Sequence, residues 1–365
     1  MNKKIIIILT IFPMIFSSCL QNDEEYSNKD FPIEIKVDPV VELFCIIHRL
    51  ADTEQYNTNK FPKYINDIED RFGKYKNHKA ISLAIQQKNL NRINGSAPMS
   101  LAVYLNSLPA LKPKNSLSSS PEGLDHRWTE KLANEFIVAA KSFSATTSFM
   151  QFYNNKQELY KRSINNLYSH IKRDSILEWF EMYFGYQPGK YTIILGMQNG
   201  RGNYGLTVTH KDGTKEYIAI IGASTQFWSN TPTFSNRWIT PTIVHEFCHS
   251  YINPLVDKNY KTLKESADKI FDKEPPANYY LPNIMIYEYL VRACTIRYFY
   301  SKNDQKTVNR RIKIDKKEGF PAIEDLVELL GKYETSRNRY EKFIDFMPEI
   351  QLFFNSYANK KNNTL

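Results

Sequence analysis

The spacing of apolar residues predicts a chain built mostly of helices. Apolar positions recur with the period of an amphipathic helix in several long stretches. The stretch 112–123 is rich in Pro, Ser and Gly, so we expect a loop or a boundary there. The predicted helical regions are 38–50, 61–90, 97–108, 126–184 and the chain from 240 onward.

The middle of the chain has a pattern typical of strands. Candidate strands cover 191–197, 205–210 and 216–222, and Asp212-Gly213 between the last two predicts a hairpin. We therefore expect an α+β fold that is predominantly helical, with a small, mostly antiparallel sheet. The predicted organisation is a helical N-terminal region at 38–185, followed by a region at 186–365 that holds the sheet and the C-terminal helices.

The first residues are typical of an export signal. Two lysines precede the apolar run 5–16, and small residues lead to Cys19. This layout predicts a signal peptide at 1–18, a lipidated Cys19 and a tether at 19–37. The ending resembles a bacterial lipobox, and acidic residues follow it, so we expect export to the outer membrane, a lipid anchor and cell-surface exposure. The alternative is a plainly cleaved signal in which Cys19 is incidental.

Composition and net charge say little about which class of partner the protein binds. Hydrophobic residues are 42% and charged residues 24%, both ordinary for a globular chain. The net charge is +9, and beyond residue 18 the chain has 46 basic and 39 acidic residues, which does not indicate nucleic-acid binding. The basic stretch 309–317 is interpreted as solvated surface. Beyond Cys19 an odd number of cysteines remains, so buried free thiols are expected at Cys45, Cys248 and Cys294.

One motif indicates metal chemistry. His245, Glu246 and His249 form an HExxH sequence, which on a helix places both histidines on one face. Two imidazoles can hold a zinc ion, which lowers the pKa of a bound water, and Glu246 can accept its proton. The alternative is a pair of core histidines bonded to backbone carbonyls.

The residues around the motif predict the helix that carries it. Thr240 can cap the helix and Pro241 suits its first position, whereas Pro254 should limit its far end.

A third metal ligand downstream of the motif must be a carboxylate or Cys294, because no histidine follows His249. Glu288 lies in an apolar, aromatic helical stretch, where an unpaired carboxylate is unfavourable, and it is our preferred ligand. Arg292, four residues further on, can pair with Glu288 instead, or can support it from behind. The other candidates lie in a polar stretch and are interpreted as solvated charges: Asp257, Glu265, Asp268, Asp272 and Glu274.

With its HExxH motif and Glu288, the chain resembles the gluzincin metallopeptidases, in which HExxH is followed by a Glu on a second helix. It is also similar to an uncharacterised bacterial family of lipoproteins assigned as metallopeptidases. The stretches that carry this resemblance are 37–51, 72–81, 203–208, 243–254 and 287–293. The resemblance implies a zincin-like catalytic unit with zinc on His245, His249 and Glu288, and Glu246 as base. It implies no particular substrate.

Other residues are candidates for roles around the site. The strand 216–222 is a candidate for pairing with extended substrate, or it is an ordinary hairpin strand. The glycines of 200–205 match GxGxxG, but a strand follows, so a rim loop is expected rather than a dinucleotide site. The group that faces the developing oxyanion stays open among an arginine, Tyr279, Tyr280, Tyr289, Tyr298 and His210.

The sequence thus predicts zinc-dependent hydrolysis of a peptide or protein substrate by an exported, membrane-anchored peptidase. One alternative is a non-catalytic, zincin-like surface lipoprotein that binds peptide or glycan. A second alternative is a helical scaffold without metal.

Overall fold

The computed structural model describes most of the chain and is predominantly helical, as predicted. The described residues are 26–27, 31–58, 61–117, 123–172, 174–186, 189–200, 202–223, 231–271 and 281–363. The predicted signal peptide and Cys19 lie outside them. Among the residues described, no helix is both long and apolar enough to cross a lipid bilayer.

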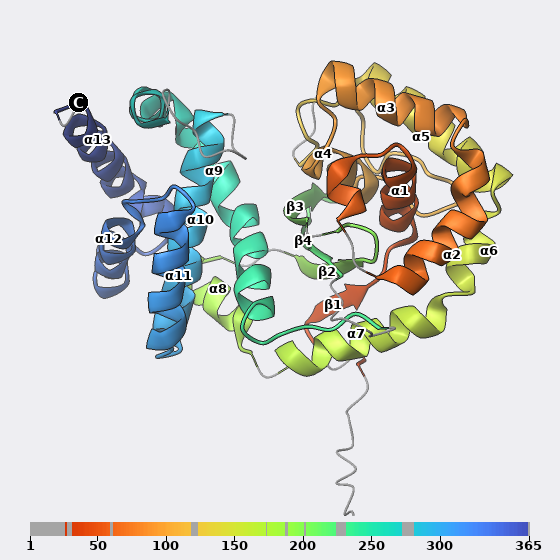
Figure 1. Ribbon diagram of the computed structural model, residues 1–365. Coiled ribbons are helices and arrows are strands. Elements are labelled where there is room, and N and C mark those ends of the chain that lie inside the picture. Colours follow the sequence, from red (N-terminus) through yellow and green to blue (C-terminus); the bar gives the residue numbers. More distant parts are fainter. Residues whose placement is uncertain are drawn as a thin grey trace, which may run out of the picture.

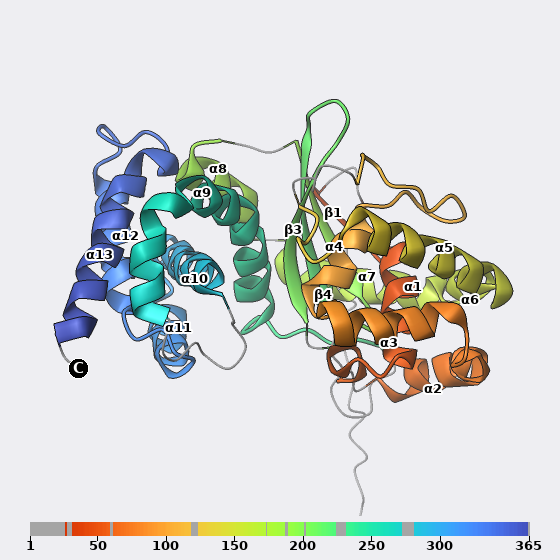
Figure 2. The same ribbon diagram turned by 90° about the horizontal axis from the view of Figure 1, so that it is seen from above.

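Figures 1 and 2 show two lobes. The first lobe holds the sheet and the early helices α1 (Pro39–Leu50), α2 (Pro62–Phe72), α3 (Lys79–Asn91), α4 (Ser96–Val103), α5 (Glu130–Thr146), α6 (Phe149–Asn154) and α7 (Gln157–Ile171). The second lobe holds α8 (Ile176–Phe184), α9 (Ile239–Phe271), α10 (Pro282–Ser301), α11 (Gln305–Lys317), α12 (Ile323–Thr335) and α13 (Met347–Asn363). Short 3-10 turns lie at Glu54–Asn57, Gly73–Tyr75 and Phe343–Phe346.

The sheet has four strands in the order β1-β2-β4-β3. They are β1 (Ile33–Lys36), β2 (Lys190–Gly196), β3 (Asn203–Thr209) and β4 (Lys215–Gly222). The predicted hairpin is confirmed, because β3 and β4 pair antiparallel, with Gly205 opposite Ala219. The expectation of a mostly antiparallel sheet is wrong, since β1 pairs with β2, and β2 with β4, in parallel. Periodicity marks a strand but not its partner, and the parallel pairs join segments far apart in the chain.

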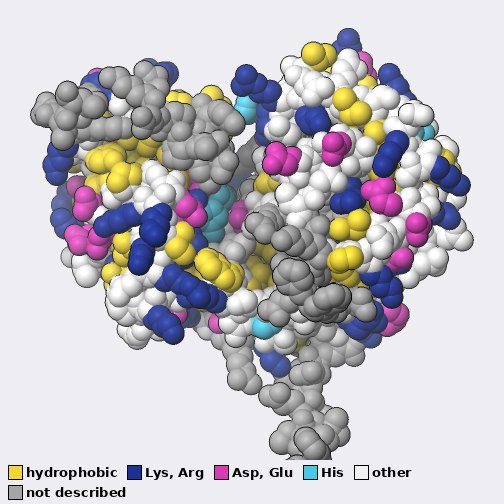
Figure 3. All heavy atoms as spheres, viewed as in Figure 1, with side chains coloured by type: hydrophobic (Ala, Val, Ile, Leu, Met, Phe, Trp, Pro, Cys, Tyr) yellow, Lys and Arg dark blue, Asp and Glu magenta, His cyan; other side chains and the backbone are white. Residues whose placement is uncertain are grey.

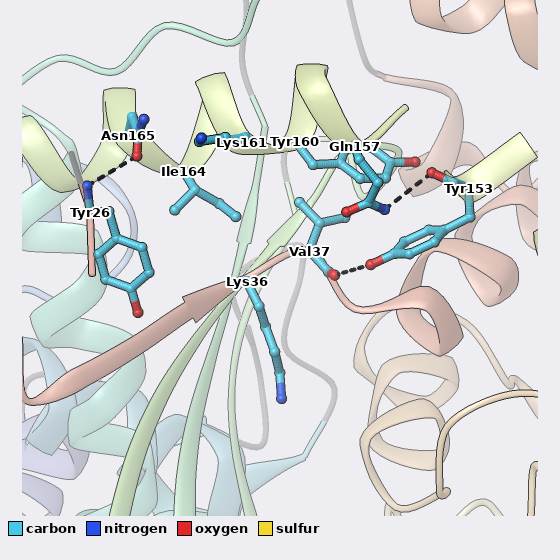
Figure 4. A pocket seen from close by; sticks show the side chains of 9 residues that line it. All are labelled: Tyr26, Lys36, Val37, Tyr153, Gln157, Tyr160, Lys161, Ile164 and Asn165. Carbon is cyan, nitrogen blue, oxygen red and sulfur yellow. Dashed lines mark hydrogen bonds between the residues drawn. The ribbon is translucent and has the colours of Figure 1, made fainter. Parts of the chain in front are cut away.

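Strand β1 occupies residues that the sequence interpretation placed in the tether. It pairs with β2, and the residues around it are bonded to α6 and α7. The Tyr26 amide donates to Asn165 Oδ1 at 3.2 Å, and the Tyr153 hydroxyl donates to the Val37 carbonyl at 2.6 Å (Figure 4). A pocket of about 270 Å³ remains between β1 and α7. The segment from Ile33 to Lys36 is too short and too weakly periodic to reveal a strand without its neighbour.

The two lobes do not follow the predicted boundary at 185/186. Helix α8 precedes it but packs with the C-terminal helices: Trp179 packs edge-on against Tyr298 of α10, and the Tyr333 hydroxyl of α12 donates to the Tyr183 carbonyl at 2.7 Å. Strands β2, β3 and β4 follow the boundary but join the N-terminal helices in one lobe (Figure 1).

The sheet is also the layer that connects the lobes. On one side, the Met197 amide at the end of β2 donates to Glu42 Oε1 of α1 at 2.6 Å. On the other side, Tyr191 of β2 packs edge-on against Phe247 of α9, and Tyr217 of β4 packs edge-on against Tyr251. Burial on both faces explains why β2 and β4 read as continuous apolar runs.

Candidate metal centre

Helix α9 carries the HExxH motif and is longer than predicted. It begins at Ile239, so Thr240 lies inside its first turn and donates its hydroxyl to Asp174 Oδ2 at 2.7 Å rather than capping the helix. Pro254 lies inside the helix, which continues to Phe271. A proline removes one backbone donor and favours a bend. The later part of α9 indeed runs in a different direction from the first part (Figures 1 and 2). Because the helix continues past Pro254, the prediction that it ends there was wrong.

His245, His249 and Glu288 converge between α9 and α10. The two Nε2 atoms lie 3.3 Å apart. Glu288 Oε2 is 3.7 Å from His245 Nε2, and Glu288 Oε1 is 3.5 Å from His249 Nε2. Figure 3 shows a hollow between the two lobes, with histidine side chains visible inside it. The three ligand residues predicted from the sequence therefore lie together, on adjacent helices.

The spacing of these atoms fits a tetrahedral metal ion. Ligand atoms at about 2.0–2.2 Å from zinc are separated by about 3.3–3.6 Å along a tetrahedral edge. The separations of 3.3 and 3.5 Å fall within that range, and the third, 3.7 Å, lies 0.1 Å above it. Two imidazoles and one carboxylate leave a fourth position open, as catalytic zinc sites require. The donor set also suits zinc better than Mg²⁺ or Ca²⁺, which prefer oxygen ligands.

The protonation of the triad depends on burial and on Glu288. Burial holds the pKa of His245 well below its usual range, so that ring is neutral. Burial also lowers the pKa of His249, but the hydrogen bond and negative charge of Glu288 outweigh it and raise the value to about 8. A metal must displace the proton of His249, so we expect weaker zinc binding below that pH.

Each histidine presents Nε2 to the triad. His249 Nδ1 lies 3.2 Å from Asn253 Oδ1, one turn further along α9, and donating its proton there leaves Nε2 free to bind a metal. His245 Nδ1 is buried and has no hydrogen-bond partner among the described residues. Asn253 was missed in the sequence analysis, although its spacing of four residues from His249 indicates it.

Arg292 bonds the Glu288 oxygen that also lies 3.7 Å from His245 Nε2, so Glu288 both pairs with Arg292 and lies against the histidines. Arg292 Nε donates to Glu288 Oε2 at 3.1 Å. Its Nη1 donates to Asp315 Oδ1 and to Glu318 Oε2, each at 2.6 Å. The guanidinium also lies 4.3 Å from the centre of the Phe320 ring.

Part of this network comes from the basic stretch that was interpreted as solvated surface. Asp315 is fully buried within α11 and also accepts from Arg311 at 3.2 Å. Only the packing of α11 on α10 shows that this acid faces inward, because lysines surround it in the sequence.

Glu246 lies where strand β3 crosses α9. The residue is 6% exposed, and its carboxylate accepts a hydrogen bond from the Gly205 amide. Burial raises the pKa of Glu246 to about 7, which suits a group that exchanges protons at neutral pH. A Cβ atom at Gly205 would lie 1.9 Å from the Glu246 carbonyl oxygen and 2.8 Å from His249 Cβ. Only glycine therefore allows β3 to approach the motif this closely.

The remaining acidic candidates lie elsewhere. Asp257 accepts from the Tyr287 hydroxyl, while Glu265 and Asp268 pair with Lys269 and Lys264 on the surface of α9. Asp272 and Glu274 lie outside the described residues. Asp257 and Glu265 are exposed and Asp268 is half-buried, which agrees with their interpretation as solvated charges.

The predicted free thiols are confirmed, because Cys45, Cys248 and Cys294 are all free and buried. Burial raises the pKa of Cys248 well above its usual range, so this thiol is not an activated nucleophile.

The structure also tests the other predicted roles. Strand β4 pairs on both sides and cannot accept a substrate strand, whereas β3 is at the edge of the sheet. Of the oxyanion candidates, His210 pairs with Glu216 at the hairpin, Tyr289 packs on Phe320, and Tyr298 packs on Trp179. Tyr279 and Tyr280 lie outside the described residues.

Comparison with known proteins gives a family but no activity. The model of a family described as "Domain of unknown function (DUF4932)" matches residues 33–352, which is most of the chain. No curated protein and no solved structure matches the chain.

Proposed function

The chain belongs to the DUF4932 family, and from its site we propose that it is a zinc-dependent peptidase with a gluzincin-like, zincin-type catalytic unit. The observation that carries the proposal is the convergence of His245, His249 and Glu288 at tetrahedral-edge distances. Glu246 is held beside them by strand β3. The alternative of two core histidines bonded to backbone carbonyls does not account for a carboxylate placed against both rings.

Under this proposal each residue of the site has a separate role in the reaction. A zinc ion on the triad would supply a Lewis acid that polarises the scissile carbonyl and acidifies water. Glu246 accepts the proton of the attacking water and delivers it to the leaving amine, a transfer suited to its raised pKa. Arg292 holds Glu288 in its orientation, and Asn253 holds His249 in the tautomer that exposes Nε2.

The edge strand supports a peptide as the substrate. Strand β3 pairs only with β4 among the described strands, and Gly205 brings it against the motif. We propose that extended substrate adds to β3, so that main-chain hydrogen bonds hold the peptide beside Glu246. This assigns to β3 the role that the sequence analysis considered for 216–222.

The first test measures metal content and hydrolysis together. Purified protein without residues 1–19 should bind one zinc ion per chain and cleave members of a broad peptide library. Glu288→Gln should lower the zinc affinity at least tenfold, because a neutral amide replaces a charged ligand. Asp257→Asn is the matched control, since this acid lies outside the triad, and it should keep both zinc and activity.

Glu246→Gln separates binding from catalysis. It should retain near-stoichiometric zinc but lose at least about 10³-fold in kcat, because the proton acceptor is removed while all three ligands stay. Cleavage at the wild-type rate by this variant would exclude Glu246 as the base. Absence of zinc from the wild-type protein at neutral pH would overturn the whole proposal.

We also propose export and lipid anchoring through Cys19, on the pattern of residues 1–19. The full-length protein should partition into the detergent phase after expression in a bacterium that acylates lipoproteins. Cys19→Ala should partition into the aqueous phase, and unchanged partitioning would exclude the anchor.

A further inference from the structure

A tryptophan between two arginines lies at the start of the helix that carries the metal ligands. Trp238 directly precedes α9 and is 46% exposed. The guanidinium carbons of Arg237 and Arg310 lie 5.3 Å and 5.7 Å from its ring centre. Arg310 also donates to the Arg237 carbonyl at 3.1 Å, so α11 is joined to the start of α9. We call Arg237, Trp238 and Arg310 the arginine–tryptophan cluster.

The positive charge of the cluster is only partly offset by an acid, Asp304, which forms no ion pair with it among the described residues. Within the described residues, neither Arg237 nor Arg310 forms an ion pair with a carboxylate. Arg310 Nε is buried and has no hydrogen-bond partner among those residues. Burial, and then the charge of Arg237, lowers the pKa of Arg310, although the charge of Asp304 acts in the opposite direction. An anion between the two arginines would relieve their repulsion and use the open donors.

Helical geometry places the cluster beside the proposed metal site. The Thr242 amide donates to the Trp238 carbonyl at 3.0 Å, so Trp238 continues the register of α9. His245 lies seven residues further on, which is within about 20° of two full turns and about 10 Å along the axis. Trp238 and His245 therefore share one face of α9.

Helix α11 gives a second link between the cluster and the triad. Arg311, the neighbour of Arg310, bonds the same Asp315 that holds Arg292 and, through it, Glu288. Figure 3 shows basic side chains next to apolar ones over α11, beside the hollow between the lobes.

We propose that the arginine–tryptophan cluster is a specificity subsite that binds a carboxylate of the peptide substrate. Extended peptide rises about 3.3 Å per residue, so 10 Å corresponds to about three residues from the scissile bond. The carboxylate belongs to an acidic side chain or to the C-terminus, and it packs against Trp238 while the two guanidinium groups donate to it. This inference rests on the proposed peptidase function and adds the class of substrate.

The test compares peptides that differ only in one charge. Quenched fluorescent peptides carry Glu or Gln at each of the four positions on either side of the cleaved bond. We expect kcat/KM to favour Glu by about fivefold to tenfold at one position about three residues from that bond, and less at high salt. Arg310→Gln and Arg237→Gln should each reduce the ratio below about twofold. Lys313→Gln, an exposed charge on the same helix, is the control and should leave it unchanged.

Free and amidated C-termini distinguish the two sources of the carboxylate. If the preference follows the terminal carboxylate, amidation abolishes it; if it follows an acidic side chain, amidation leaves it intact. Either result supports the subsite. Equal cleavage of Glu and Gln peptides at every position, with both kinds of C-terminus, would overturn it while leaving the peptidase proposal in place.

A binding measurement keeps the subsite testable if no peptide is cleaved. The same Glu and Gln peptides are titrated into Glu246→Gln protein while tryptophan emission is followed, with Trp238→Phe as the blank. Tighter binding of Glu peptides that Arg310→Gln removes would support the subsite even if hydrolysis fails. Equal binding would exclude it, and so would a preference for anionic phosphatidylglycerol vesicles over acidic peptides.

Discussion

Substitution of Gly205 by alanine tests the contact between the sheet and the metal-binding helix. The new Cβ would lie 1.9 Å from the Glu246 carbonyl oxygen, whereas real Cβ contacts essentially never fall below 3.0 Å. Strand β3 and α9 must therefore separate by at least about 1.1 Å, because the opposing atom is backbone and cannot rotate away. Such overpacking typically costs about 1–3 kcal/mol of folding free energy.

The same displacement should affect catalysis more than metal binding. A misplacement of about 1 Å near reacting groups can lower a rate about 100-fold. The new Cβ would also lie 2.8 Å from His249 Cβ, so Gly205→Ala should weaken zinc binding somewhat as well, while kcat/KM measured at saturating zinc falls about 100-fold. The assay pairs zinc content with the initial rate of cleavage of one library peptide.

Gly73→Ala is the matched control for this experiment. Gly73 has ordinary helical backbone angles, and a Cβ there meets its nearest atom, the end of the flexible Glu69 side chain, at 3.5 Å. It should leave zinc content and rate unchanged and keep or slightly raise the stability. If Gly205→Ala retained its rate within about twofold of the wild type, close packing of β3 against the motif would not be what positions Glu246.

Three further predictions address pH, metal support and the thiols. Burial raises the pKa of Glu42 to about 8, so the folded state favours its protonated form; that stabilisation is complete below pH 4.5, the ordinary pKa, and is lost as the pH rises through 8. Glu42→Gln, which stays neutral, should therefore gain stability over the wild type from pH 5 to pH 9, by up to roughly 4 kcal/mol in denaturant titrations; equal changes for both proteins would contradict this. Arg292→Lys cannot bond Glu288 and the Asp315–Glu318 pair at the same time, and it should weaken zinc binding about tenfold to 100-fold in competition with a chelator. Arg297→Lys, which breaks a pair with Glu334 away from the triad, should not. The free and buried cysteines are Cys45, Cys248 and Cys294. In protein without residues 1–19, a thiol reagent should modify none of them in the folded state and all of them after unfolding. Rapid reaction of the folded protein would show that their burial is incomplete.

The sequence determined the parts of this protein that depend on local periodicity and local chemistry. Helical spacing predicted α1 and most of the later helices, and the Asp-Gly turn predicted the pairing of β3 with β4. His245 and His249 are brought together by one turn of a single helix, so their spacing alone was enough. Glu288 could be chosen from several acids because an apolar helix makes an unpaired carboxylate unfavourable.

Tertiary structure decided what depends on partners distant in the chain. Strand β1 is defined by its pairing with β2, more than 150 residues away, and the direction of that pairing made the sheet mixed. Pro254 lies inside α9 without ending it because packing outweighs a local propensity. Asp315 and Gly205 look ordinary in the sequence and acquire their roles only when α11 reaches Arg292 and β3 reaches Glu246. A sequence pattern records the environment that a residue needs, whereas packing determines which residue supplies it.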